Sequence, residues 1–151
     1  MEIRKARIGD IDSIHRLING YAEKGLMLPR SLSLLYESIR EFAVADEGGE
    51  VIGTASLHIL WHDLAEIRAV AVNADHTRRG IGRALLRFLI EEARALGIPR
   101  LFALTYKPEF FQKCGFRLVP KEELPQKVWR DCINCPKFPN CDEVALILDL
   151  R

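Results

Sequence analysis

A basic stretch with two glycines, Thr77-Arg78-Arg79-Gly80-Ile81-Gly82, is the part of the sequence best suited to chemistry. It joins an aliphatic segment at 64–72 to a segment with helical spacing of apolar residues at 83–96. Glycines let a ligand approach the backbone, the first N–H groups of a helix point outward, and the dipole and arginines favour phosphate oxygens. The pattern therefore predicts a cradle for the phosphates of a nucleotide-bearing ligand.

A tight strand-to-helix turn would use the same two glycines without any ligand, so the surrounding residues matter. The stretch lacks the Gly-Lys-Ser/Thr ending of a phosphate-binding P-loop. It also lacks the third glycine of a dinucleotide fingerprint. Both absences count against a nucleoside triphosphate or a nicotinamide dinucleotide as the ligand.

Extended to Leu86, this stretch resembles the acetyl-CoA signature of the GNAT superfamily of acyltransferases, usually written Gln/Arg-x-x-Gly-x-Gly/Ala. Thr77 departs from that pattern, which bears on one side-chain contact and not on the backbone cradle. A second stretch, 110–116 (Phe-Phe-Gln-Lys-Cys-Gly-Phe), resembles the Phe-Tyr-x-Lys-x-Gly-Phe landmark of the same family. The resemblance implies an acetyl-CoA-dependent N-acetyltransferase whose fold covers nearly the whole chain.

The resemblance also implies where the coenzyme lies. The strand ending near Val72 should diverge from the strand starting at Leu101, with pantetheine in the gap as though it were an extra strand. A backbone N–H near Val70 to Val72 would then polarise the thioester carbonyl and stabilise the oxyanion. The implied coenzyme-binding residues are Val70, Ala71, Val72, Thr77, Arg78, Arg79, Gly80, Ile81, Gly82, Arg83, Ala84, Phe110, Phe111 and Lys113.

Glu66 lies upstream of the cradle on the same expected strand, a position that resembles the catalytic glutamate of several GNAT enzymes. An α-amino group, whose pKa in peptides is about 7.7 to 8.0, is largely protonated at neutral pH, so acyl transfer to it needs a base. We expect Glu66 to be that base, acting through a water. The alternative is a surface glutamate paired with Arg68 or a lysine.

The thiolate that leaves coenzyme A is often reprotonated in this family by the tyrosine of the second landmark, and here that position is Phe111. Tyr106 is the nearest substitute in the sequence, although it could simply pack at a strand end. Water could also suffice, because a thiolate with a conjugate acid of pKa near 8.5 leaves readily.

Four segments resemble the bacterial N-acetylglutamate synthases of arginine biosynthesis more closely than GNAT proteins at large. They are Leu28-Pro29-Arg30-Ser31, Ala65-Glu66-Ile67-Arg68, 100–105 (Arg-Leu-Phe-Ala-Leu-Thr) and Leu124-Pro125. The resemblance implies the short form that lacks an amino-acid-kinase domain, with glutamate as acceptor. Cations suit its two carboxylates, and the candidates are Arg30, Arg68, Lys127 and Arg130, each of which could instead be a solvated surface charge.

Three cysteines, Cys132, Cys135 and Cys141, crowd into one C-terminal stretch. The first two have metal-ligand spacing, but a structural zinc site needs four ligands, so Asp142, Glu143 or Cys114 would have to complete it. Buried cysteines that shape a loop, or a redox-sensitive pair, are the alternatives. We predict no metal. His15, His58, His62 and His76 show no partner spacing and are expected to be ordinary.

The elements that must hold these residues follow from the spacing of apolar residues, which predicts one α/β (α+β) domain over 1–151, with a mixed sheet of about seven strands and about four helices. Asp10 should cap the first helix, and Gly25 and Gly97 should end helices. The expected strands are 3–8, 42–45, 51–60, 64–72, 101–104, 116–119 and 144–150. The expected helices are one beginning after residue 10, one from 31 or 33 to about 40, 83–96 and 108–113.

Composition bounds the possible partners. The 151 residues contain 22 Lys and Arg against 21 Asp and Glu, so a formal charge of +1 offers no global field for nucleic acid or anionic lipid. No apolar run approaches the ~20 residues of a membrane span, and Met1 precedes charged residues, so we expect a soluble cytoplasmic protein. We also consider a homodimer. The competing functions are acetylation of another small or protein amine, a non-catalytic acyl-CoA sensor and a nucleic-acid-binding module.

Overall fold

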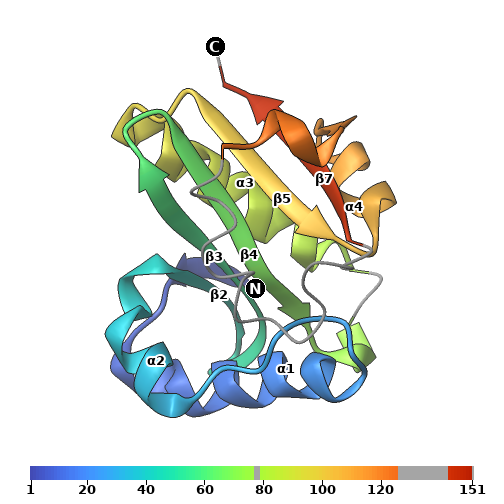
Figure 1. Ribbon diagram of the computed structural model, residues 1–151. Coiled ribbons are helices and arrows are strands. Elements are labelled where there is room, and N and C mark those ends of the chain that lie inside the picture. The colour runs from blue at the N-terminus through green and yellow to red at the C-terminus, as the bar shows by residue number, and fades with distance from the viewer. Residues whose placement is uncertain (77–78, 126–142, 151) are drawn as a thin grey trace.

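The computed structural model describes residues 1–76, 79–125 and 143–150, where one mixed sheet of seven strands carries helices on both faces (Figure 1). The sheet order is β1-β2-β3-β4-β5-β7-β6, and only β4 and β5 are parallel neighbours. The strands are β1 (Glu2–Lys5), β2 (Phe42–Glu47), β3 (Glu50–Trp61), β4 (Leu64–Val72), β5 (Arg100–Thr105), β6 (Arg117–Val119) and β7 (Val144–Asp149). The α-helices are α1 (Ile11–Glu23), α2 (Leu32–Glu37), α3 (Ile81–Leu96) and α4 (Pro108–Lys113). The expected fold class is confirmed.

Helix α3 covers one face of the sheet through an apolar stripe of four-residue spacing. Leu85, Leu89 and Ala93 are fully buried, together with Leu86 in the same cluster. A fully buried leucine contributes about 1.5–3 kcal/mol relative to an exposed one, so this stripe fixes the helix on the sheet. Gly97, with φ of 83°, ends the helix as expected.

Helices α1 and α2 cover part of the opposite face. Ile14 and Ile18 of α1 and Leu35 of α2 are fully buried against Phe42 of β2. The Ser31 side chain accepts a hydrogen bond from the Leu34 N–H, so it is Ser31 and not Ser33 that caps α2. This second apolar cluster fixes α1 and α2 on the sheet.

The sequence prediction is wrong at two element ends. The first strand stops at Lys5 instead of Ile8, and a 3₁₀ turn, Ile8–Asp10, follows. Asp10 is the N-cap residue of α1, as expected, but its side chain makes no capping hydrogen bond there. Its carboxylate instead accepts the Arg7 N–H at 2.7 Å and closes the preceding turn. The second helix stops at Glu37, and a separate 3₁₀ helix, η2 (Ile39–Glu41), leads into β2.

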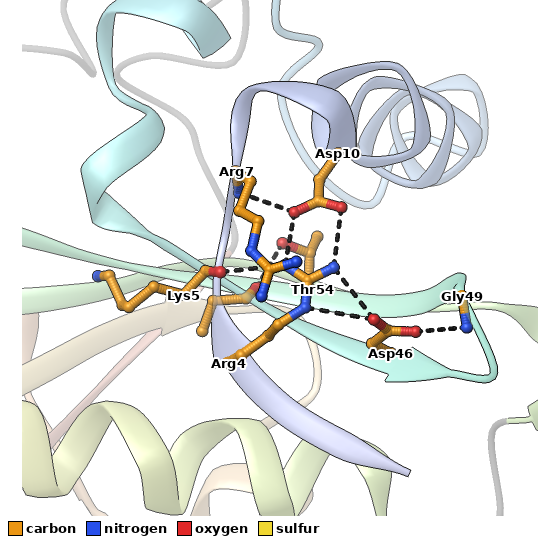
Figure 2. A network of polar contacts seen from close by, with 8 residues as sticks. Arg4, Lys5, Arg7, Asp10, Asp46, Gly49 and Thr54 are labelled. Carbon is orange, nitrogen blue, oxygen red and sulfur yellow. Dashed lines mark hydrogen bonds and ion pairs between the residues drawn. The ribbon is translucent and has the colours of Figure 1, made fainter.

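The guanidinium of Arg4 connects the start of α1 to the β2–β3 hairpin (Figure 2). It lies 2.8 Å from Asp10 and 3.1 Å from Asp46, and all three side chains are at most 18% exposed. The Arg4 guanidinium holds the pKa of the Asp10 carboxyl below its usual value, against the opposing effect of burial. Asp46 also accepts the Gly49 N–H at 2.8 Å, so the network fixes the hairpin turn as well.

Candidate active site

Strands β4 and β5 pair over only two positions and then diverge. Ala65 pairs with Leu101 and Glu66 with Phe102, and no further β4–β5 pair follows in the described chain. On its other side β4 remains paired with β3 as far as Val72. Figure 1 shows β4 and β5 spreading apart toward their C-terminal ends. The divergence expected between these strands is therefore present, and it leaves one edge of β4 without a strand partner.

A bulge in β4 accompanies the divergence. Thr54 pairs with Ala71 and Ser56 with Arg68, so β4 has two residues between these pairs where β3 has one. Ala69 is one of those two residues and has φ of 54°, which a residue with a Cβ adopts at a cost of about 1–3 kcal/mol. A bulge bends its strand and re-aims the residues beside it. The strained alanine therefore stands where β4 turns away from β5.

Beyond the bulge, Tyr21 of α1 contacts the edge of β4 that has lost its partner. The Tyr21 hydroxyl donates to the Val72 carbonyl at 2.8 Å, and the Val72 N–H donates back to it at 3.4 Å. The Asn73 N–H donates to β3, at Ile52 O, so the N–H groups of Val72 and Asn73 point to opposite edges of β4.

The N-terminus of α3 supports the predicted cradle at Gly80. Its φ is 75°, and no heavy atom of the described residues lies within 4 Å of the position that a Cβ would take. Gly82 is explained differently, because a Cβ there would lie 3.0 Å from two ring carbons of Phe110. Gly82 therefore admits the Phe110 ring, and Gly80 is the glycine that keeps the first turn open. Thr77 and Arg78 lie outside the described residues.

Arg79 forms a bidentate ion pair with Glu47 at the β2–β3 hairpin. Its two terminal nitrogens lie 2.6 and 2.7 Å from the carboxylate oxygens, and one lies 2.7 Å from Nδ1 of His76. This pairing raises the pKa of Arg79 and lowers that of Glu47. Both side chains are well exposed, so a phosphate group could compete for the guanidinium.

The remaining predicted coenzyme residues differ in accessibility. Phe111 is 6% exposed and makes edge-to-face contacts with Phe110 and Phe116, so its ring belongs to the core. Lys113 is exposed at the end of α4, and Arg83 is exposed on α3. Burial raises the pKa of the nearby Cys114 thiol, and the Arg83 guanidinium opposes that effect. Ile81 is buried under the helix start, and Ala84 lines a groove between α3 and β1.

Glu66 is buried beside Arg68. Only 7% of the residue is exposed, and its Oε1 accepts a hydrogen bond from Arg68 Nε at 2.6 Å. The alternative raised from the sequence, a surface glutamate paired with Arg68, is right about the partner and wrong about the surface. A buried carboxylate bonded to a guanidinium is fixed in position, as an aimed base requires.

Arg30 lies on the same sheet face as Glu66 and Arg68. Phe42, Ser56 and Arg68 form a cross-strand row on β2, β3 and β4, so their side chains share a face. The guanidinium of Arg30 lies 6.0 Å from the ring centroid of Phe42, at the β2 end of that row. The side chains of two predicted glutamate ligands and the predicted base are therefore gathered on the face that α1 and α2 partly cover.

The backbone of Arg30 is fixed by Asn19 of α1, a residue that the sequence analysis did not single out. The Asn19 amide accepts the Arg30 N–H at 3.3 Å and donates to the Arg30 carbonyl at 3.2 Å. Tyr21 and His58 were also missed. His58 pairs with Glu66, and counting back along the two predicted strands from the turn at 61–63 would have found that pair.

Other predicted site residues are less informative. Tyr106 follows β5 and is half-buried. Lys127, Arg130 and the three clustered cysteines, Cys132, Cys135 and Cys141, lie outside the described residues. Within the described ranges, no group of three or more His, Cys, Asp or Glu side chains is arranged to hold a metal ion, and no helix is both long and apolar enough to cross a membrane.

Comparison with known sequences gives a consistent family. A model of the acetyltransferase (GNAT) family matches residues 11–116. An uncharacterized N-acetyltransferase of Chlorobaculum tepidum is 43% identical over 98% of this chain and 96% of its own length. An amino-acid acetyltransferase of Mycobacterium tuberculosis is 44% identical over 76% of this chain and 67% of its own length.

Comparison with solved structures agrees. A Mycobacterium tuberculosis protein in complex with CoA and NLQ superposes with a TM-score of 0.89 at 34% identity, with both chains fully covered. N-acetylglutamate synthase from Neisseria gonorrhoeae, complexed with coenzyme A and N-acetyl-glutamate, gives a TM-score of 0.91 at 34% identity. That match covers 99% of this chain but 35% of the Neisseria chain, so the similarity is to one part of a longer enzyme.

Proposed function

Because the chain belongs to the acetyltransferase (GNAT) family, we propose that this acetyl-CoA-dependent N-acetyltransferase acts on the α-amino group of an amino acid, namely L-glutamate. The observation that carries glutamate is the placement of Arg30 and Arg68 on the same sheet face as buried Glu66. Amino-acid acetyltransferases among its relatives and the N-acetyl-glutamate in the Neisseria complex support the same acceptor.

The residues at the start of α3 and along β4 fit acetyl-CoA. Gly80 leaves open space in front of the first turn of α3, whose N–H groups and dipole suit the pyrophosphate. The divergent edge of β4 offers N–H and C=O groups in strand geometry, which suits the amides of pantetheine. The coenzyme supplies the thioester that is attacked.

On this proposal Glu66 takes a proton from the ammonium group of the acceptor through a water molecule, and the free amine attacks the thioester carbon. The carbonyl oxygen gains negative charge as the C–N bond forms, and the Val70 N–H donates to it. The C–S bond then breaks. Tyr106 is the candidate to protonate the thiolate, and water can do the same.

For the acceptor, Arg68 would bind one carboxylate and Arg30 the other. The contact with Glu66 uses the Nε–H of Arg68, which is one of five N–H donors on a guanidinium. Lys127 and Arg130 remain candidates for the same task. We further propose a single domain, a role in arginine biosynthesis, a cytoplasmic location and a homodimer, all of which follow from the resemblance to the short synthases.

A thiol-release assay with acetyl-CoA across the free amino acids tests this function. We expect the highest kcat/KM with L-glutamate, and clearly lower values with glutamine and aspartate because each alters one carboxylate or its position. Arg30→Ala should raise KM for glutamate about 10-fold or more, as expected for loss of a charged hydrogen bond. Arg16→Ala is the matched control, since Arg16 is exposed on α1 and contacts only Ser13 among the described residues. Equal rates with all amino acids would refute glutamate as the acceptor.

A further inference from the structure

His58 of β3 lies directly opposite Glu66 of β4 in the antiparallel pairing. Residues paired in this way stand on the same sheet face, with Cβ atoms about 4.5–5.5 Å apart. An imidazole and a carboxylate on such neighbours can reach each other directly or through one water. The proposed base therefore has a titratable neighbour that the acetyl-transfer step itself does not use.

The imidazole of His58 is oriented by a second carboxylate. Its Nδ1 lies 3.2 Å from both carboxylate oxygens of Glu41, the last residue of η2. Among the described residues, Glu41 is the polar partner of the His58 ring. A carboxylate at Nδ1 favours the tautomer that carries its proton there, so Nε2 keeps the lone pair that can accept a proton.

The chemistry creates a proton that has to leave a buried place. An ammonium nitrogen loses two protons on becoming an amide, and the thiolate recovers one, so each turnover releases one proton to solvent. The side chain of Glu66 is only 10% exposed, and its Oε1 accepts a hydrogen bond from Arg68 Nε at 2.6 Å. A proton taken up by Glu66 therefore has little direct access to water.

We propose that His58, oriented by Glu41, is the relay that takes this proton from Glu66 and passes it to solvent. The O–H bond on Glu66 breaks, an N–H bond forms at Nε2, and the carboxylate is ready for the next turnover. The imidazolium then gives the proton to bulk water. The His58 side chain is 31% exposed against 10% for Glu66, so the imidazole has the better access to solvent.

The charged groups around His58 suit a transient imidazolium. Glu41 from η2 and Glu66 from β4 both stabilise a positive ring, and Arg68 from β4 opposes it while bound to Glu66. The neighbouring part of this face is covered by the apolar residues Ile14 and Ile18 of α1. The relay rests on the proposed role of Glu66 and acts for whichever amine is the acceptor.

His58→Gln tests the relay, with His62→Gln in the exposed β3–β4 turn as the matched control. We expect His58→Gln to lower kcat about 10-fold or more while KM for the acceptor stays within about 2-fold, because acid–base groups act on the chemical step. Added imidazole should restore kcat in proportion to its concentration. The acidic limb of the wild-type kcat profile between about pH 5 and 8 should disappear in the variant. Glu41→Gln should give a smaller loss of kcat.

An unchanged kcat in His58→Gln, or a loss that imidazole does not restore and that leaves the pH profile intact, would overturn the relay. Thermal melts of each variant separate a folding defect from a kinetic one, and a normally folded Glu41→Gln with wild-type kcat would count against orientation by Glu41. Glu66→Gln is measured in parallel, using the amine of the panel with the highest rate. If Glu66→Gln is slow and His58→Gln is not, only the relay fails; if both keep the wild-type rate, the proposed base fails with it.

Discussion

At the scale of single residues, the two glycines of the cradle motif turn out to have different physical tasks. Gly80 has a left-handed backbone and open space before it, whereas Gly82 makes room for the Phe110 ring. A sequence motif reports that both are glycine but not which neighbour each one admits. The tertiary contact with α4 decides that, and α4 is 26 residues or more away from the motif in the chain.

Gly80→Ala and Gly82→Ala should therefore fail in different ways. In Gly80→Ala the positive φ costs about 1 kcal/mol of stability and the added methyl group obstructs the coenzyme, so affinity for coenzyme A should fall. In Gly82→Ala the methyl group strikes Phe110, and Phe110→Leu in the same chain should recover most of the lost stability. Calorimetry with coenzyme A and thermal melts measure the two effects, and additive losses in the double variant would contradict the packing explanation.

Glu66 illustrates how far residue types can carry a functional prediction. Its place on the strand before the cradle was predictable, but its burial and its 2.6 Å contact with Arg68 depend on the fold of the whole sheet. Glu66→Gln should lower kcat about 100-fold or more, because the amide cannot accept the proton. Glu91→Gln, on an exposed position of α3, is the control and should keep the wild-type rate. A Glu66→Gln protein with unchanged maximal rate and pH profile would remove the base.

At the scale of elements, the strands and helices with strong local patterns were predicted well. Both ends of β4 and both ends of α4 agree with the sequence prediction, because aliphatic alternation and a leading proline are local signals. The end of β1 was wrong because Asp10 bonds to Arg7 and Arg4, and Arg4 also bonds to Asp46, 42 positions away. The bulge at Ala69 has no signal either, since alanine is an uncommon choice for a positive φ.

Substitutions at Ala69 test the contribution of that bulge. Ala69→Val should destabilise the protein by about 2 kcal/mol or more and lower kcat/KM, because a β-branched residue tolerates φ of 54° poorly. Ala69→Gly should stay within about 1 kcal/mol of the wild type, since relief of strain offsets the greater freedom of the unfolded chain. Urea unfolding and steady-state kinetics measure both. Normal stability in Ala69→Val would mean that the bulge is not strained.

At the scale of the whole molecule, the network around Arg4 joins three elements that are far apart in the sequence (Figure 2). It holds β1, the start of α1 and the β2–β3 hairpin through Asp10 and Asp46. The near-balance of basic and acidic residues predicted no global electrostatic field. It did not indicate that one arginine would bind two carboxylates. Such partners come together only when the sheet forms.

Arg4→Met should therefore change stability in a pH-dependent way. Asp10 has its folded-state pKa lowered by Arg4, so its contribution is complete above its usual value of 3.8 and is lost as the pH falls through the folded value. At pH 7 we expect a loss of about 2–4 kcal/mol in the variant, because two carboxylates lose a buried partner. Near pH 2 to 3 the difference from wild type should shrink. Urea unfolding at several pH values checks this, and a difference independent of pH would contradict it.

The edge of β4 that lacks a strand partner beyond Glu66 also has a thermodynamic consequence. On the proposed function the coenzyme occupies this open edge, so its binding should stabilise the fold as well as supply the thioester. Linkage sets the size of the effect at about 2.7 kcal/mol when the ligand exceeds its dissociation constant a hundredfold. The melting temperature should then rise with the concentration of coenzyme, and the chain without coenzyme should be cleaved faster by proteases.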